Sequence, residues 1–231
     1  FPSRGPVARA RARRRITARF ARKGGSVRDR WQGFRHHDES KRRTWQDPES
    51  ILRRIGLEAG HVFVDVGCGN GFFALPAARI VGPGGAVIGI DVDASGIDEL
   101  RRRAEREGLE NVRLTVGRAE ETRACEGCAD IVFFGNDLHD FEDPEIVLEN
   151  ALYMIRPAGL LVDLDWKKAE TPFGPPLEVR FTEEEASGMI SSAGFVVFDI
   201  GDSGEYHYLA LARPAGPPAG TLPGSAGTEK A

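Results

Sequence analysis

Short apolar runs alternate with amphipathic stretches from about residue 47 to residue 214. Apolar runs bounded by turn residues are typical of buried strands, and apolar positions spaced three and four residues apart are typical of helices. The runs predict strands at 61–66, 86–91, 111–116, 129–134, 158–164, 195–200 and 205–212. The amphipathic stretches predict helices that begin at 48, 72, 94, 144 and 183.

This alternation predicts an α/β fold with a doubly wound, mostly parallel sheet of seven strands. Only residues 201–204 join the last two strands, so we expect these strands to form an antiparallel hairpin. Several helix starts carry local capping signals. Asp47 and Asp143 each precede a proline, and Thr182 with Glu185 makes a capping box.

Composition divides the 231-residue chain into four segments. Residues 1–30 are an Arg-rich arm that we expect to be disordered, and residues 31–46 are a cap or lid. Residues 47–214 form the α/β domain, and the Pro- and Gly-rich residues 215–231 form a disordered tail. No stretch has the roughly 18–20 apolar residues that cross a bilayer, and no secretory signal is visible.

Charge is unevenly distributed along the chain. Residues 1–35 hold twelve of the 31 basic residues but only one acid, Asp29, although the net charge is −4. This arm is interpreted as an anchor for nucleic acid or another anionic partner, as a transit peptide, or as an extension without a role, which we favour. Three cysteines, an odd and small number, favour a reducing compartment, and we expect the protein in the cytoplasm. Nothing in the sequence indicates an oligomeric state.

The most informative stretch runs from residue 61 to residue 93 and reads as strand, glycine turn, helix, turn and strand. Its turn has the spacing D-x-G-x-G-x-G from Asp65 to Gly71. Glycines let the backbone approach a ligand, and the next helix offers unpaired amides. Asp91, at the end of the second strand, is placed to bind the hydroxyls of a ribose. A dinucleotide fingerprint is excluded because Phe72 stands where its third glycine would be.

This pattern, with the terminal hairpin, resembles the class I S-adenosylmethionine-dependent methyltransferases from about residue 47 to residue 214. The resemblance implies S-adenosyl-L-methionine as cofactor and S-adenosylhomocysteine as product. It implies that the glycine loop binds the methionine end, Asp91 the ribose and Val92 the adenine. The implied cofactor residues are Asp65, Gly67, Cys68, Gly69, Gly71, Asp91, Val92, Arg118, Ala119, Glu120 and Asn136. The segments NDLHDFEDPE and DWKKAETPFGPPLEVRFTEEE resemble a small microbial subgroup akin to the ubiquinone/menaquinone and arsenite methyltransferases.

Methyl transfer from a sulfonium needs an in-line nucleophile and a dry, positioned site more than it needs acid–base machinery. The catalytic candidates follow the fourth strand: Asp137, and His139 as a base that titrates near neutrality. The alternative, which we favour for His139, is that it packs or hydrogen-bonds at the strand end. The predicted substrate-pocket residues are Trp31, Phe34, Trp45, Asp165, Trp166, Lys167 and Phe173.

Cys125 and Cys128 form a C-x-x-C pair. Such a pair binds zinc or a soft arsenic species, or cycles as a disulfide. No second C-x-x-C supplies the remaining ligands of a zinc site, so we predict no metal and interpret both residues as inert thiols.

The function predicted from the sequence is methyl transfer to a small-molecule acceptor by in-line displacement. RNA or protein methylation through the basic arm is an alternative; the D/N/S-P-P-Y/F motif of base amino-group methylators is absent, because Asn136 to His139 stand in its place. The third hypothesis is a subunit that binds the cofactor without catalysing methyl transfer.

Overall fold

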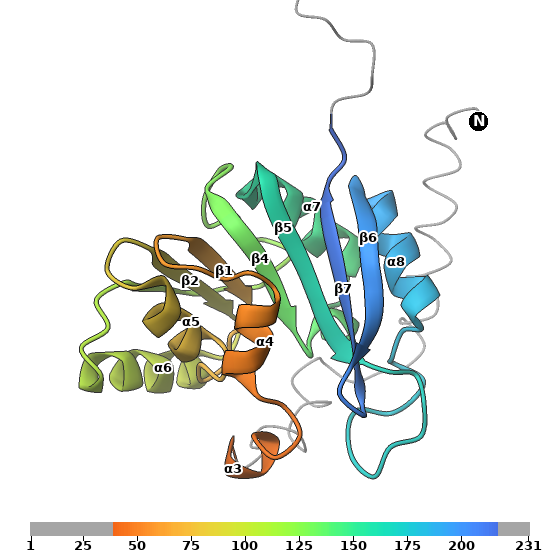
Figure 1. The fold of residues 1–231 in the computed structure, drawn as a ribbon, viewed down its shortest axis with the longest axis horizontal. Coiled ribbons are helices and arrows are strands. Elements are labelled where there is room, and N and C mark those ends of the chain that lie inside the picture. The colour runs from red at the N-terminus through yellow and green to blue at the C-terminus, as the bar shows by residue number, and fades with distance from the viewer. Residues whose placement is uncertain (1–38, 217–231) are drawn as a thin grey trace, which may run out of the picture.

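A sheet of seven strands runs through residues 39–216, the range that the computed structural model describes (Figure 1). The strands are β1 (Val62–Val66), β2 (Ala86–Asp91), β3 (Val112–Val116), β4 (Ala129–Gly135), β5 (Ile155–Trp166), β6 (Phe195–Ser203) and β7 (His207–Pro214). Their order is β3-β2-β1-β4-β5-β7-β6, and β7 is antiparallel to both of its neighbours while the other pairs are parallel. The predicted α/β fold, with a reversed strand inserted by the terminal hairpin, is confirmed.

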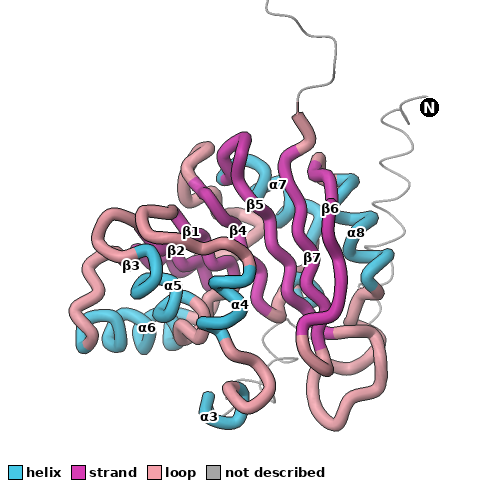
Figure 2. Tube along the Cα trace, viewed as in Figure 1, coloured by secondary structure: helices cyan, strands magenta, loops and turns pink. Residues whose placement is uncertain are grey.

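Helices cover both faces of this sheet, as Figure 2 shows. They are α3 (Glu39–Arg42), α4 (Pro48–Arg54), α5 (Ala74–Val81), α6 (Ala94–Arg106), α7 (Pro144–Met154) and α8 (Glu183–Ser192), with a short 3-10 helix η1 (Leu138–Asp140). The helices α4, α5 and α6 share one apolar cluster with the sheet, and α7 and α8 share the other. Burial on both faces explains why the central strands read as continuous apolar runs rather than alternating ones.

Four of the predicted helix starts, at residues 48, 94, 144 and 183, are confirmed, and each has a side-chain cap. The start predicted at residue 72 is wrong, because α5 begins at Ala74 and its N-cap residue makes no side-chain cap. The Asp47 carboxylate accepts from the backbone N–H of Ser50 at 3.3 Å, and the Asp143 carboxylate accepts from that of Ile146 at 3.2 Å. Thr182 and Glu185 form the reciprocal capping box. Each cap satisfies an amide that the first helical turn leaves unpaired and contributes about 1 kcal/mol.

The predicted link of the hairpin is wrong. Residues 201–203 continue β6, because they pair with residues 207–209 of β7, and the chain turns at Gly204, which has a φ of 74°. The fifth strand also begins earlier than predicted, at Ile155, since this residue already pairs with Ala129 of β4. In both places the pairing of the neighbouring strand extends the element beyond its apolar run.

Residues 1–38 and 217–231 lie outside the described range, and with them the predictions for the basic arm, the first half of the cap, Trp31, Phe34 and nearly all of the tail. Among the described residues, no helix is long and apolar enough to cross a membrane.

The carboxyl ends of β1, β2, β4 and β5 meet at one edge of the sheet, as parallel pairing requires. The short helix α3 and the loop between β5 and α8 lie at the same edge in Figure 1. Sheets of this kind bind ligands in the crevice outside these strand ends.

We expect Gly71→Ala to destabilise the ligand-free protein by roughly 1–3 kcal/mol. Gly71 has a φ of 96°, and a methyl group there would collide with Leu100 and lie 3.2 Å from Cγ of Leu75. Gly84→Ala is the matched control, because open space surrounds Gly84, and its effect should stay within about 0.5 kcal/mol. Urea unfolding measures the difference, and equal midpoints for the two variants would contradict the prediction.

Candidate functional site

The glycine loop connects β1 to α5 and is tied to the end of β2. The amides of Gly67 and Cys68 donate to the carbonyl of Ile90 at 2.8 and 3.2 Å. The Asp91 carboxylate accepts from the amide of Gly69 with one oxygen and from that of Asp93 with the other, both at 2.7 Å. The structure therefore brings the predicted loop and the predicted ribose-binding acid into direct contact. Burial raises the pKa of Asp91.

Two buried carboxyl groups flank the loop. Asp65 is 2% exposed and Asp137 is 8% exposed. Among the described residues, neither oxygen of Asp137 nor Oδ2 of Asp65 has a hydrogen-bond partner. Asp137 packs so closely on Gly67 that a side chain at Gly67 would collide with it. Burial, and then the charge of Asp91, raises the pKa of Asp65 to about 7, and burial raises that of Asp137 well above its ordinary value. Such a pair of carboxyl groups favours a cationic ligand.

The side chain of Cys68 is packed between the loop and β2, and its thiol lies 4.0 Å from the carbonyl oxygen of Gly69. Its thiol is buried against Gly89, where a methyl group would lie 2.8 Å from the sulfur, and burial raises its pKa. In contrast to the buried Cys68, Val92 is 64% exposed beside Asp91. An exposed apolar side chain at this place is suited to pack on a flat ring, and its predicted contact with adenine stays a prediction.

The third predicted cofactor segment, residues 118–120, is held by α7. Asn150 donates to the carbonyls of Ala119 and Glu120, both at 2.9 Å. Glu120 accepts from the amide of Glu142 at 3.0 Å, and Arg118 lies 2.8 Å from the Glu142 carboxylate. These contacts fix the path of the segment, while the adenine contacts predicted for it stay predictions.

Asn136 joins β4 to the cap. It has a φ of 72°, and its backbone N–H donates to the carbonyl of Leu164 at 2.7 Å. Its side chain and that of Gln46 exchange hydrogen bonds at 3.2 Å. Arg42 in turn donates to Gln46 at 2.8 Å. This contact between residues 90 positions apart brings α3 over the glycine loop.

His139 lies between two carboxylates. Its Nδ1 is 2.7 Å from Asp165, and its Nε2 is 2.8 Å from Asp140. Burial opposes a charge on this imidazole, but the two carboxylates outweigh burial and raise its pKa well above the ordinary value. A protonated ring with both nitrogens engaged has no lone pair to accept a proton. The arrangement therefore favours the structural interpretation of His139 over the role of general base.

An aromatic cluster covers the ends of β5 and β7. The ring of Trp45 lies 5.6 Å from Trp166, 5.3 Å from Phe173 and 5.3 Å from His207, with which it is stacked. The structure thus brings together the three predicted pocket aromatics of the described range. The sequence did not single out His207. Its ring is 4.3 Å from that of Trp166, and its Nε2 has no partner among the described residues.

The other two predicted pocket residues of the described range do not join this cluster. Asp165 turns to the opposite face of the sheet, where it binds His139 and the Trp166 amide. Lys167 pairs with Asp202 at 2.8 Å and so fastens the hairpin. Alternation along β5 separates Asp165 from Trp166, because successive side chains of a strand point to opposite faces.

Cys125 and Cys128 form a disulfide, with their Cα atoms 6.0 Å apart, which is within the range that a disulfide bridges. The interpretation of both as inert free thiols is therefore wrong, and the disulfide alternative holds. The cysteine count did not predict this bond, because it follows from the fold of the loop between β3 and β4.

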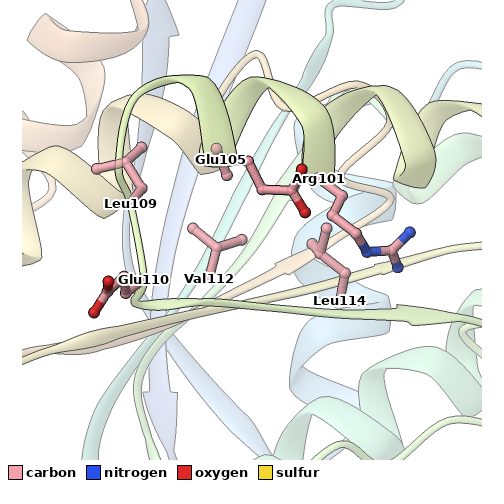
Figure 3. Close-up of a pocket in the computed structure, with 7 residues that line it drawn as sticks. Arg101, Glu105, Leu109, Glu110, Val112 and Leu114 are labelled. Atoms are coloured by element: carbon pink, nitrogen blue, oxygen red, sulfur yellow. The ribbon is translucent and has the colours of Figure 1, made fainter.

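A surface hollow lies away from the glycine loop, between the second half of α6 and β3 (Figure 3). Its lining residues are Arg101, Ala104, Glu105, Leu109, Glu110, Val112 and Leu114. It shares no residue with the loop or with the aromatic cluster.

Comparisons with known proteins agree with this geometry. The family model described as a methyltransferase domain matches residues 57–209. A crystal structure of a SAM-dependent methyltransferase from Aquifex aeolicus is 29% identical, with a TM-score of 0.71, and the match covers 77% of this chain and 98% of that one. A putative type 11 methyltransferase from Sulfolobus solfataricus is 26% identical, with a TM-score of 0.61 and coverage of 74% and 93%.

A demethylmenaquinone methyltransferase of Geobacillus kaustophilus is 30% identical over 117 residues, which are 51% of this chain and 50% of the relative. The chain thus spans about half the length of the curated relatives that it matches.

We expect His139 to be charged and His207 to be neutral at pH 7. Burial lowers the pKa of His207 to about 3, whereas the carboxylates raise that of His139. The contribution of charged His139 to the free energy of unfolding is complete below about pH 6.5 and is lost as pH rises through its folded pKa. The contribution of neutral His207 is lost as pH falls below about 6.5. Nitrogen-15 NMR of the rings, assigned with His139→Gln and His207→Phe, measures both states. A neutral His139 at pH 7 would restore the general-base role.

Proposed function

We propose that this chain transfers a methyl group from S-adenosyl-L-methionine to a small-molecule acceptor, because it belongs to the class I S-adenosylmethionine-dependent methyltransferase family. The observation that carries the proposal is the hydrogen bond between the amide of Gly69 and the carboxylate of Asp91. This contact sets Asp91, the acid predicted to bind the ribose, beside a glycine loop at the crevice of a parallel sheet.

The charges of the site fit this cofactor. Its methionine end carries an ammonium and a sulfonium, and Asp65 and Asp137 present buried carboxyl oxygens that have no partner among the described residues. A bound cation would favour the ionised forms of both groups and so offset the effect of burial on their pKa values. Val92 and Asp91 then face the nucleoside end.

The bound cofactor supplies an electrophilic methyl group on sulfur. The chain positions the donor and the acceptor, excludes water from the site and supplies charged groups. The glycine loop and Asp91 hold the donor, and the cap segment with Gln46 and Asn136 covers it. Of the two predicted catalytic residues, Asp137 is the better base for an acceptor proton, because both of its oxygens are unengaged by the described residues.

We propose a planar, ring-bearing acceptor. The aromatic cluster consists of Trp45, Trp166, Phe173 and His207. It lies near Asn136, because Trp45 is followed in the chain by Gln46, whose side chain bonds to Asn136. Aromatic side chains that line a pocket stack on flat apolar ligands. The name of the Geobacillus relatives points to a quinone-type ring for those proteins. The alternative acceptors, RNA or protein held by residues 1–35, depend on residues outside the described range, so no observation favours them.

We expect S-adenosylhomocysteine to bind the protein with a Kd in the micromolar range, and Asp91→Ala to weaken binding by roughly 10- to 100-fold, the worth of charge-assisted hydrogen bonds. Asp98→Ala is the control, because Asp98 is an exposed acid on the neighbouring helix that pairs only with Arg101 among the described residues. Isothermal calorimetry measures both. Wild-type protein that binds no S-adenosylhomocysteine would overturn the proposed function.

We expect Phe173→Ala to raise the KM of a ring-bearing acceptor by roughly two- to tenfold, the worth of an aromatic contact, and to leave the Kd of S-adenosylhomocysteine unchanged. Phe198→Ala is the matched control, because Phe198 is 53% exposed on β6. Tritiated methyl transfer into a panel of hydroxylated ring compounds, RNA and protein identifies the acceptor first. Labelling of macromolecules alone would contradict the small-molecule proposal.

A further inference from the structure

One cation of the cap, Arg42, reaches over the glycine loop. Its guanidinium carbon lies 3.9 Å from the centre of the Phe72 ring and 5.4 Å from that of Phe73. Both rings are buried directly after the loop. With its hydrogen bond to Gln46 at 2.8 Å, the guanidinium is held against the mouth of the site rather than in solvent.

Arg42 differs from its neighbours in its partners. Arg43 pairs with Glu49 at 2.9 Å, and Arg103 pairs with Glu39 at 3.0 Å. Arg42 forms no ion pair within 4.0 Å to a carboxylate of the described residues, although it feels the charges of Asp65, Asp137 and Glu39. Burial lowers its pKa to about 10, so it remains charged at neutral pH.

A desolvated guanidinium without a carboxylate in direct contact is costly, because the charges of Asp65, Asp137 and Glu39 offset its desolvation only in part. It is also pre-organised for one kind of ligand, because the planar fork of an arginine matches a carboxylate with two parallel hydrogen bonds. Opposite it, Oδ2 of Asp65 has no partner among the described residues. The mouth of the glycine loop therefore presents a cation and an acid with one unpaired oxygen, the complement of an amino-acid zwitterion.

We propose that Arg42 binds the carboxylate at the amino-acid end of the methyl donor while Asp65 takes its ammonium, an inference that rests on the proposed function. The donor then bridges the cap and the sheet. Because the Arg42 carbonyl accepts from the amides of Trp45 and Gln46 at 3.1 and 2.9 Å, the same contact positions Trp45 in the wall of the acceptor pocket. The site is thus complete only once the donor is bound.

The test compares two ligands that differ only in this carboxylate: S-adenosylmethionine and its decarboxylated form. Wild-type protein should bind the former more tightly by roughly 10- to 100-fold, the worth of a bidentate charged contact. In Arg42→Gln this preference should fall below about threefold, through weaker binding of S-adenosylmethionine. Arg43→Gln is the matched control, since it removes an adjacent exposed cation of the same segment, and it should keep the wild-type preference.

Calorimetry gives all six affinities, and circular dichroism with thermal unfolding checks that the variants fold. A preference that persists in Arg42→Gln would overturn the inference, and so would an equal weakening of both ligands, which would mean that Arg42 only supports the loop. Either result leaves the proposed function standing. Wild-type protein that binds neither ligand would instead overturn the proposed function and this inference together.

Discussion

The carboxylate of Asp91 is the contact on which the site depends. It ends β2 and binds the amides of Gly69 and Asp93, so one side chain joins the turn after β1 to the start of α6. This is feasible only because parallel pairing brings the ends of β1 and β2 to the same edge and because Gly71 packs on Leu100 without a side chain. The crevice is therefore a property of the sheet, and the loop is shaped to fit it.

Burial decides the electrostatics of the site residue by residue. His139 and His207 are both nearly inaccessible to water. Two carboxylates flank His139 and raise its pKa, whereas the rings of Trp45 and Trp166 lie against His207, and desolvation lowers its pKa. Asp163 is held by the hydroxyl of Tyr208 at 2.8 Å, whereas Asp137 has no partner among the described residues. Asp65 and Asp137, which flank the glycine loop, both carry carboxyl oxygens without a partner among the described residues, as expected where a charged ligand completes the site.

The donor side and the acceptor side of the site rest on different kinds of support. The glycine loop, its contact with Asp91 and the family match support the proposed donor side. The acceptor side rests on one cluster of rings and on the cap that carries Trp45. A shared fold hosts many reactions, and the acceptor is set by the side chains added to it. The link from Arg42 through Gln46 to Asn136 is what couples the two sides.

The sequence by itself determined the elements of the sheet, the capped helix starts and the pairing of a glycine loop with an acid at the end of the next strand. These depend on residues a few positions apart, or on the rule that parallel strands end together, so a linear pattern carries them. Only the tertiary structure decided that Arg42 lies over the loop, that His207 joins the aromatic cluster, that Asp165 and Lys167 leave it and that Cys125 bonds to Cys128. The first three depend on which faces pack together across separations as long as the 90 positions between Gln46 and Asn136, and no local spacing encodes them. The disulfide joins residues three positions apart, but it depends on how their loop folds.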